Sequence, residues 1–441
     1  MSPEDTSTAS ASRAPVPEGT IPVAIATVVG GVSTYVFFKI GQQALGQDGF
    51  KPIVAMWFIS FALIPGFFGS LEQETSRALA HRRGRGEGGI PVMQRIIPIA
   101  LVMLAVLVIA LVATAPMTTS RFFEGNVAVM VGMILMLFTY GALHVSRGLL
   151  AGTGRFPSFA LMIGLDGAIR VIVCTALWLS GVESTGVYAI AVSLSPIVGV
   201  IIVSAKGDLR LSSGPPAPWS EITSNLGWLF LGTLFAAALV NAGPLAVDIL
   251  GSDAPAEVVT RFGNGVIFAR VPLFLFGAIQ AALLPKLARL AGQRDMVEFR
   301  IGLRRLLVFV IGVGIVGTVG AFAVGPWVLE LVYQGGIDRR TMGLLAAASA
   351  IYMLALALAQ AVIALHGHAA VAYGWIIGFV TFVVVAWLSS DDLYLRVELA
   401  LVASSVVALA VFAWVAKKRL DEGSSADIDS IIEAMTERPL D

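Results

Sequence analysis

Arg270 is the residue whose position in the sequence points most directly to a functional role. It lies about midway along the apolar stretch from Arg261 to Leu290, which is long enough to cross a lipid bilayer. A guanidinium at that depth costs several kcal/mol unless it faces a cavity or a partner, so the position predicts a functional residue. Pro272 removes a helix hydrogen bond nearby and predicts a kink. The alternative is a structural ion pair between Arg270 and an acid elsewhere in the chain.

A second cation within an apolar stretch, Lys39, belongs to a polar stripe. Gly31, Tyr35, Lys39 and Gln43 recur every four residues, so they share one face of a helix. That face predicts polar contacts in a cavity, with Lys39 binding an anion. Because Lys39 lies near the end of its helix, snorkelling of its ammonium to the membrane interface explains the position equally well.

Other charges within apolar stretches predict pairing or coupling. Asp166 and Arg170 lie four residues apart, a spacing that lets them pair on one helix face. We expect a structural pair that bridges helices, with a cargo or proton site as the alternative. Asp248, considered together with Asn241, is a weaker candidate for cation coupling, and an exposed interfacial acid is the simpler interpretation.

The composition indicates a polytopic membrane protein. Of 441 residues, 57% are hydrophobic and 13% charged, and the mean hydropathy of +0.86 is far above that of a soluble globular protein. The single cysteine, Cys174, excludes an internal disulfide and a cysteine-cluster metal site, and the four histidines show no ligand spacing. We therefore expect an all-α fold without a metal or cofactor.

Apolar runs of about 20 residues predict twelve membrane spans. They are expected near 20–45, 51–74, 95–116, 126–147, 157–180, 185–205, 222–250, 258–283, 303–325, 341–365, 369–388 and 394–416. Residues 1–19 are rich in Ser, Ala, Pro and Thr and lack the pattern of a signal peptide. They predict a flexible tail.

The distribution of Lys and Arg predicts that both termini are cytoplasmic. With the N-terminus inside, twenty of these cations fall in cytoplasmic segments and six in outer loops. Lys39, Arg170 and Arg270 remain within spans. Topology alone explains the basic segments 77–95 and 286–305, and contacts with anionic membrane lipids are an additional interpretation.

An internal repeat divides the chain into two lobes. The second span and its exit resemble the eighth at a shift of 212 residues, which pairs Arg77 with Arg289 and Phe58 with Arg270. Each half holds six spans, so an axis along the membrane normal relates the halves around a central cavity. The expected parts are an N-lobe at 20–205, a cytoplasmic linker at 206–221, a C-lobe at 222–416 and a cytoplasmic tail at 417–441.

Charges at the expected cytoplasmic mouth predict a gate. Glu72, Glu74 and Arg77 follow the second span, and Arg289 is the repeat counterpart of Arg77. Solvated salt bridges are the simpler interpretation of these charges.

Four segments resemble motifs of the multidrug/oligosaccharidyl-lipid/polysaccharide flippase superfamily. ALGQDGFKPIVAM (44–56) is similar to its entry to helix two, LLAGTGRF (149–156) to its helix-four exit, AALLPKLARLAGQRD (281–295) to its helix-eight exit and VLELVYQGG (328–336) to its loop after helix nine. The resemblance covers most of residues 20–415. HRRGRG (81–86) superficially resembles a loop of the major facilitator superfamily, but the Asp–Arg pair that anchors that motif is absent.

The resemblance implies two six-helix lobes that alternate between inward-open and outward-open states. Polysaccharide and lipid II flippases of this superfamily tend to line the cavity with Arg and Lys, whereas its cation-coupled multidrug exporters use carboxylates. Because Arg270 and Lys39 suit a diphosphate, we expect a flippase of polyprenyl-diphosphate-linked oligosaccharide in the cytoplasmic membrane. The rest of the expected substrate site is Tyr35, Gln43, Asn264 and Gln280. The amides of Asn264 and Gln280 would otherwise bond neighbouring helices.

The alternative is a cation-coupled small-molecule exporter of the same superfamily, dependent on Asp248 or Asp166. A membrane glycosyltransferase would need a catalytic acid in a substantial outer loop, and every expected outer loop is short, so we do not expect an enzyme. The expected partners are the lipid-linked saccharide and membrane lipids, with polysaccharide-assembly enzymes as further candidates and no nucleic acid. We expect the protein to function as a monomer.

Overall fold

The computed structural model describes residues 20–223, 226–251, 254–273, 276, 290–291, 295–333 and 336–436. Within these ranges its regular elements are all helices, which confirms the predicted all-α class. They are α1 (Thr20–Gly84), α2 (Ile90–Ala113), α3 (Ala115–Phe122), α4 (Val127–Thr153), α5 (Phe156–Leu179), α6 (Thr185–Ala205), α7 (Ser220–Thr223), α8 (Leu226–Leu250), α9 (Ala256–Ala269), α11 (Met296–Tyr333), α12 (Arg339–Ala364), α13 (His368–Leu388) and α14 (Leu393–Thr436). Ten helices in the described part are long and apolar enough to cross a membrane. The chain is therefore a multi-pass membrane protein.

The long helix α1 contains the first two predicted spans. Its backbone breaks at Gly46, whose φ of 69° suits a residue without a Cβ atom. The two halves fold back on each other, because the ring of Phe37 lies 5.8 Å from that of Phe50 and 5.5 Å from that of Trp57. Since α1 holds two spans, the ten helices account for eleven of the twelve predicted spans. The eighth, 258–283, begins in α9 and lies partly outside the described residues.

Local sequence signals explain several helix ends. The side chain of Asn126 caps α4 by accepting from the backbone N–H of Ala128 over 3.0 Å, and Gly154 ends the same helix with a φ of 76°. The side chain of Asp338 caps α12 in the same way. None of the predicted spans corresponds to α3. The span predicted at 303–325 corresponds to α11, which is longer, with 38 residues. A hydropathy window finds the apolar part of a helix and misses its polar ends.

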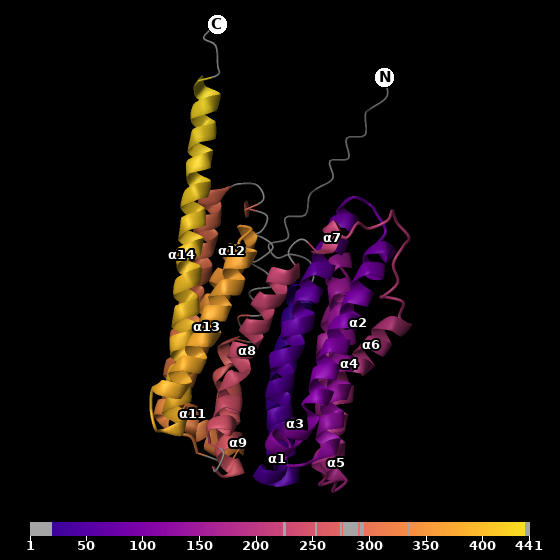
Figure 1. Ribbon diagram of the computed structural model, residues 1–441, viewed down its shortest axis with the longest axis vertical. Coiled ribbons are helices and arrows are strands. Elements are labelled where there is room, and N and C mark those ends of the chain that lie inside the picture. The colour runs from indigo at the N-terminus through magenta and orange to yellow at the C-terminus, as the bar shows by residue number, and fades with distance from the viewer. Residues whose placement is uncertain are drawn as a thin grey trace, which may run out of the picture.

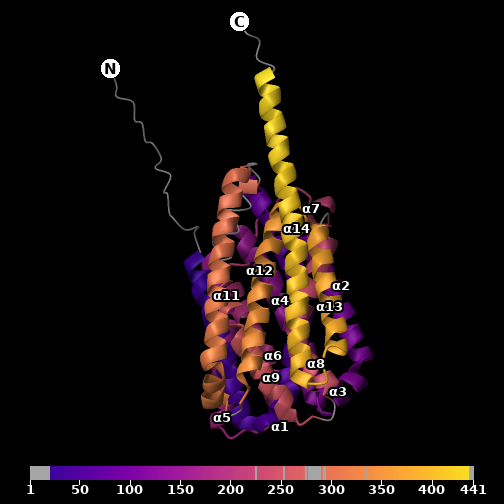
Figure 2. The same cartoon turned by 90° about the vertical axis from the view of Figure 1, so that its left-hand side faces the viewer.

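The helices form two groups, shown in Figures 1 and 2. In the N-lobe, α1 packs on α4 and α5, and α6 packs on both of these helices. In the C-lobe, α12 packs on α11 and α14, while α13 packs on α14 and α8. The lobes meet where α1 of the N-lobe packs against α8 and α9 of the C-lobe. This arrangement confirms the predicted two-lobe architecture.

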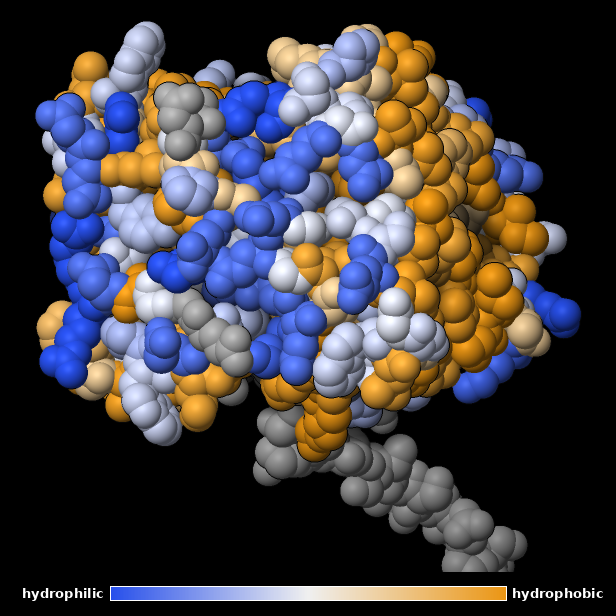
Figure 3. Space-filling model, turned by 90° about the horizontal axis from the view of Figure 1, so that it is seen from below, coloured by the Kyte–Doolittle hydropathy of each residue, from blue (hydrophilic) through white to orange (hydrophobic). Residues whose placement is uncertain are grey.

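The first and last described helices begin and end on the same side of the molecule, as Figures 1 and 2 show. We call this side the termini end and the opposite side the far end. The kink of α1, the short helix α3 and the helix α9 lie toward the far end, whereas α14 extends past the other helices at the termini end. Figure 3 views the far end, where hydrophilic residues gather, while hydrophobic residues cover the flank in view. Such a division suits a protein whose sides contact lipid.

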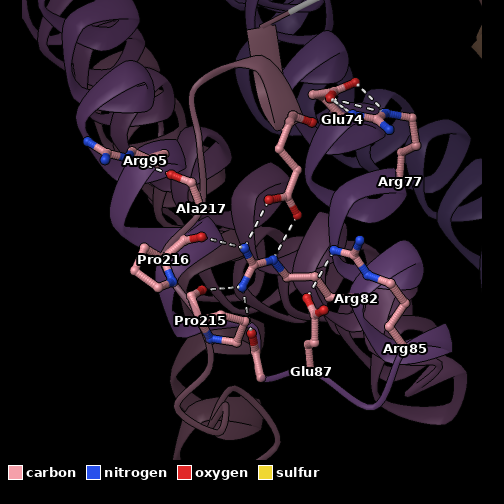
Figure 4. A network of polar contacts seen from close by, with 11 residues as sticks. Glu74, Arg77, Arg82, Arg85, Glu87, Arg95, Pro215, Pro216 and Ala217 are labelled. Atoms are coloured by element: carbon pink, nitrogen blue, oxygen red, sulfur yellow. Dashed lines mark hydrogen bonds and ion pairs between the residues drawn. The ribbon is translucent and has the colours of Figure 1, made fainter.

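The predicted linker is bound to the N-lobe by a buried arginine, Arg82, at the end of α1 (Figure 4). Its guanidinium lies 2.7 and 2.9 Å from the two carboxylate oxygens of Glu221 and donates to the carbonyl of Pro215 over 2.7 Å. Arg95 of α2 lies 4.5 Å from the ring centroid of Trp219. The segment up to Glu221 therefore packs as part of the N-lobe.

Candidate functional site

A cavity of about 580 Å³ lies between the two lobes. Helices α1, α4 and α5 line it from the N-lobe, and α8, α9, α12 and α13 line it from the C-lobe. Its charged and histidine lining residues are Arg147, Asp166, Arg170, Arg270 and His368. Three arginines against one carboxylate make the described lining cationic, which suits an anionic ligand.

The uncharged lining combines aromatic rings with polar side chains. The aromatic members are Trp57, Phe61, Trp228, Tyr352 and Trp375, and the amides are Gln73, Asn241 and Gln360. The lining extends from Arg270 to Thr27 near the start of α1 and His368 at the start of α13, so the cavity reaches the termini end. Over the described residues, no group of three His, Cys, Asp or Glu side chains is placed to hold a metal ion.

Arg270 directly follows α9, where it lines the cavity. Its Nη1 donates to Oδ1 of Asn241 over 3.1 Å, its Nη2 donates to the carbonyl of Val240, and its guanidinium carbon lies 5.4 Å from the ring centroid of Phe58. Asn241 is held in turn, because its amide donates to the carbonyl of Phe61 over 2.9 Å. Across the described ranges, no carboxylate pairs with Arg270, so the alternative of a structural ion pair finds no partner there.

Asp166 and Arg170 line the cavity from the N-lobe and contact each other, as their spacing predicts. Nη2 of Arg170 donates to Oδ2 of Asp166 over 2.6 Å and to the hydroxyl of Tyr140 over 2.8 Å. Ser195 of α6 donates to the other carboxylate oxygen over 3.2 Å, and the ring of Trp57 lies 4.7 Å from the Arg170 guanidinium carbon. The pair thus joins α5 to α1, α4 and α6, and it also faces the cavity. Whether it acts on cargo or protons stays a prediction.

The polar stripe of the first span is divided, because Gly31 lines the central cavity and its other members face the other lobe or the surface. The hydroxyl of Tyr35 donates to the carbonyl of Ile267 over 2.7 Å, across the lobe interface. Lys39 is partly exposed and Gln43 is exposed, and neither belongs to the lining of the central cavity as described. Their proposed contacts with a cargo remain predictions.

Asn264 is buried in α9 and pairs with Gln42, and its contact with a cargo stays a prediction. The two amides exchange hydrogen bonds of 2.7 and 3.1 Å between the lobes. The four-residue repeat selected Gln43 and missed Gln42, although Gln42 lies seven residues after Tyr35 and therefore on the same helix face. The other predicted amide, Gln280, lies outside the described residues.

Asp248 of the C-lobe contacts the N-lobe toward the far end. Its side chain is 3% exposed, so the interpretation as an exposed interfacial acid is wrong. Its Oδ1 lies 3.5 Å from Nζ of Lys51 and 3.9 Å from Nη1 of Arg121, both from the N-lobe. The sequence could not show this contact, because the three residues come from different helices about 70 or more positions apart.

The predicted gate residues of α1 make contacts within the N-lobe. Glu74 is buried and accepts from Nε of Arg77 over 3.1 Å, while Arg77 also donates to the backbone carbonyl of Glu221. Glu72 pairs with His144 and with a cavity-lining arginine. Arg289 lies outside the described residues. A gate between the lobes at this end therefore stays a prediction.

A second, apolar hollow of about 790 Å³ adjoins the central cavity. It lies between α1 and α11, and Gly31 lines both spaces. Its other lining residues are Val28, Val32, Tyr35, Phe268, Val271, Pro272, Phe309, Gly312, Val313, Val316 and Gly317. We call it the lateral groove. Its apolar lining suits a hydrocarbon chain.

No protein-family model matches the chain. An uncharacterized protein of Mycobacterium bovis is 27% identical over 374 residues, which is 80% of this chain and 82% of that protein. An uncharacterized protein of Mycobacterium tuberculosis is 25% identical over 397 residues, which is 84% of this chain and 86% of that protein.

The solved structures decide the fold. An inward-facing conformation of a multidrug resistance MATE family transporter of the MOP superfamily superposes with a TM-score of 0.74 at 14% identity, covering 91% of this chain and 99% of that one. The outward-facing conformation of such a transporter gives 0.71 at 14% identity, covering 92% and 96%. The chain has the fold of the MATE transporters. This MATE fold bears out the expected architecture, while at such identity it leaves the substrate open.

Proposed function

We propose that the chain is an alternating-access flippase that moves polyprenyl-diphosphate-linked oligosaccharide across the cytoplasmic membrane. The observation that carries the proposal is Arg270, a cation in a cavity between two lobes that pairs with no carboxylate among the described residues. Arg170 and Arg147 line the same cavity. An anionic headgroup would balance this charge.

Arginine suits a diphosphate because its planar guanidinium carries five N–H donors in a fixed fork. Arg270 uses donors on Nη1 and Nη2 for Asn241 and Val240, and the described residues leave it further N–H groups. Charge-assisted bonds of this kind are about twice as strong as neutral ones. The proposed role of Arg270 is therefore to hold the diphosphate while sugars occupy the wider, aromatic part of the cavity.

The lateral groove supports a cargo that is part lipid. Its lining is apolar, and it adjoins the cavity at Gly31. Val271 and Pro272, which follow Arg270 directly in the chain, line the groove. A cargo with a charged head and a hydrocarbon tail would place the head at Arg270 and the tail along the groove. A water-soluble drug would not need an apolar groove in addition to the cationic cavity.

Contacts across the lobe interface toward the far end support alternation between two states. Asp248 contacts Lys51 and Arg121 across the interface, and Gln42 pairs with Asn264. With the termini cytoplasmic, this state presents the cavity to the cytoplasmic leaflet. Breaking these contacts and closing the termini end would present it to the outer leaflet. The cycle breaks no covalent bond, and one monomer holds both lobes.

Other parts of the proposal concern the environment of the protein. Membrane lipids would contact its basic termini end, and polysaccharide-assembly enzymes would receive the flipped cargo. Glu72, Glu74, Arg77 and Arg289 are the proposed gate at that end. Lys39 and Gln280 remain proposed cargo contacts.

A strain depleted of its own oligosaccharide flippase tests the proposal. The wild-type chain should restore surface glycan, and Arg270→Ala should leave lipid-linked intermediate on the cytoplasmic leaflet. Arg261→Ala is a matched control, because Arg261 lies in α9, which Arg270 directly follows, and pairs with Glu257 near the surface. If Arg270→Ala restored surface glycan fully, the proposal would fail.

A cation-coupled exporter of small molecules is the second candidate. The observation that favours it is the carboxylate of Asp166 in the cavity lining. This carboxylate is already paired with Arg170, which leaves it less free to bind a cation. Drug export that depends on Asp166, with unchanged surface glycan, would support this candidate instead.

A further inference from the structure

A buried histidine outside the proposed headgroup site lies in the N-lobe. His144 of α4 is 7% exposed, and its Nδ1 lies 2.6 Å from Oε2 of Glu72 on α1. The other oxygen of that carboxylate, Oε1, lies 3.1 Å from Nη2 of Arg147. One carboxylate therefore contacts both an imidazole, which can take up a proton, and a guanidinium, which stays charged.

Arg147 connects this cluster to the cavity. It lines the cavity, and its guanidinium carbon lies 5.1 Å from the ring centroid of Phe159. Its Nε is buried and has no hydrogen-bond acceptor among the described residues. An anion that enters the cavity can therefore reach Arg147 and compete with Glu72 for its guanidinium.

The surroundings of His144 leave Glu72 as its ionisable contact. One turn away on the same face of α4, Tyr140 donates to Asp166, which pairs with Arg170. The ionisable side chains of the other elements packed on α4 are, besides Glu72, Asp166 and Arg170, Tyr188 of α6, Arg95 of α2, Arg121 of α3, Tyr35, Lys39, Asp48, Lys51, Glu74, Arg77, His81, Arg82 and Arg83 of α1, and Cys174 of α5. Arg95 contacts the linker, Arg121 contacts Asp248, and Glu74 pairs with Arg77.

We propose that Glu72, His144 and Arg147 form a proton-linked anion site, in which an anionic group of the cargo draws Arg147 from Glu72 and His144 takes up a proton. The proposal rests on the proposed function, because the anion is the cargo headgroup. While Arg147 contacts Glu72, the charge of the guanidinium neutralises the carboxylate and His144 stays neutral. When Arg147 turns to the anion, the carboxylate loses this cation, and His144 replaces it by taking up a proton.

The sign of the pH dependence follows from this exchange. Because binding takes up a proton, protonation must strengthen anion binding by the same coupling free energy. Affinity for the anion should therefore rise as the pH falls. For a cargo diphosphate that is esterified at both ends, a site of arginines alone, which keep their charge, would show no such dependence.

Calorimetric titration of the purified full-length protein with geranyl diphosphate, a short polyprenyl diphosphate, tests the proposal. Titrations at one pH in two buffers of different ionisation enthalpy count the protons exchanged. The wild-type protein should take up ~0.3–0.8 proton per ligand more than His144→Gln. His81→Gln, which replaces an exposed histidine at the end of α1, is the control and should match the wild type.

Glu72→Gln separates this mechanism from loss of folding. Removing the carboxylate frees Arg147, so this variant should bind geranyl diphosphate about 3–10-fold more tightly and without the linked proton. A misfolded protein would not gain affinity.

Four results would overturn the proposal. Equal proton uptake by the wild type and His144→Gln is the first, and loss of uptake in His368→Gln alone, which would assign the proton to the cavity mouth, is the second. Binding without any proton uptake in the wild type would overturn this inference and leave the proposed function intact. Absence of geranyl diphosphate binding would overturn the proposed function, and this inference with it.

Discussion

Arg170 and Arg270 lie against neighbouring rings of the same helix. The guanidinium carbon of Arg170 lies 4.7 Å from the ring centroid of Trp57, and that of Arg270 lies 5.4 Å from the ring centroid of Phe58. One arginine comes from the N-lobe and the other from the C-lobe, and both line the central cavity. Consecutive residues of α1 thus bring two cations from opposite lobes to one part of the cavity.

Trp57→Ala should weaken binding of geranyl diphosphate about 5–30-fold. Trp57 is buried beside Arg170, and cation–π contacts at desolvated sites contribute about 1–2 kcal/mol. Trp57→Phe should retain most of the affinity, because it keeps an aromatic face. Trp414→Ala, on the exposed surface of the C-lobe, is the control for a lost tryptophan. Calorimetric titration measures all four proteins, and equal affinities for Trp57→Ala and wild type would contradict this role.

A cross-link between positions 42 and 264 should stop transport. Gln42 and Asn264 touch across the lobe interface, so Gln42→Cys with Asn264→Cys places two thiols where the outward-open state requires separation. The single native Cys174 is buried and should not interfere. Transport by the double variant should fall after treatment with a short bifunctional thiol reagent. Each single variant should be unaffected by the reagent. Continued transport by a fully cross-linked protein would show that positions 42 and 264 need not separate during transport.

Asp248→Asn should favour opening of the lobe interface toward the far end. The substitution removes the charge that Lys51 and Arg121 contact, and it leaves their cations facing a neutral amide. A thiol introduced by Gln42→Cys should then react about threefold or more faster with a membrane-impermeant maleimide. Asp392→Asn, an exposed acid beside Arg340, is the control. An unchanged labelling rate would show that the contact does not hold the lobes together.

Arg82→Gln should lower the midpoint of thermal unfolding in detergent and loosen the linker. Arg82 is 2% exposed, and breaking a buried ion pair costs about 3–5 kcal/mol because the remaining charge of Glu221 loses its partner. Arg85→Gln breaks an exposed pair with Glu87 and should change stability by less than about 1 kcal/mol. Equal midpoints for the two variants would contradict the linker attachment shown in Figure 4.

Much of the fold could be predicted from the sequence, because each signal is local. Apolar runs place the spans, and the shift of about 212 residues indicates two lobes. Gly154 marks the end of α4 in the same local way. The long form of α11 was missed, because its ends carry charges that a hydropathy window rejects.

The site could be predicted only where its residues share one helix. The spacing of Asp166 and Arg170 is enough to predict their contact. The contacts of Asp248 with Lys51, and of Glu72 with His144, join helices far apart in the chain. No spacing rule predicts these contacts, because they depend on how the helices pack.

The most direct test of the central claim measures flipping in proteoliposomes. A fluorescent polyprenyl-diphosphate saccharide is incorporated, and its transfer between leaflets is followed by reduction of the exposed label. Wild-type protein and Arg261→Ala should transfer the lipid, and Arg270→Ala should slow transfer about 10–100-fold, because it removes charge-assisted hydrogen bonds to the diphosphate. Transfer at the wild-type rate by Arg270→Ala would contradict the account.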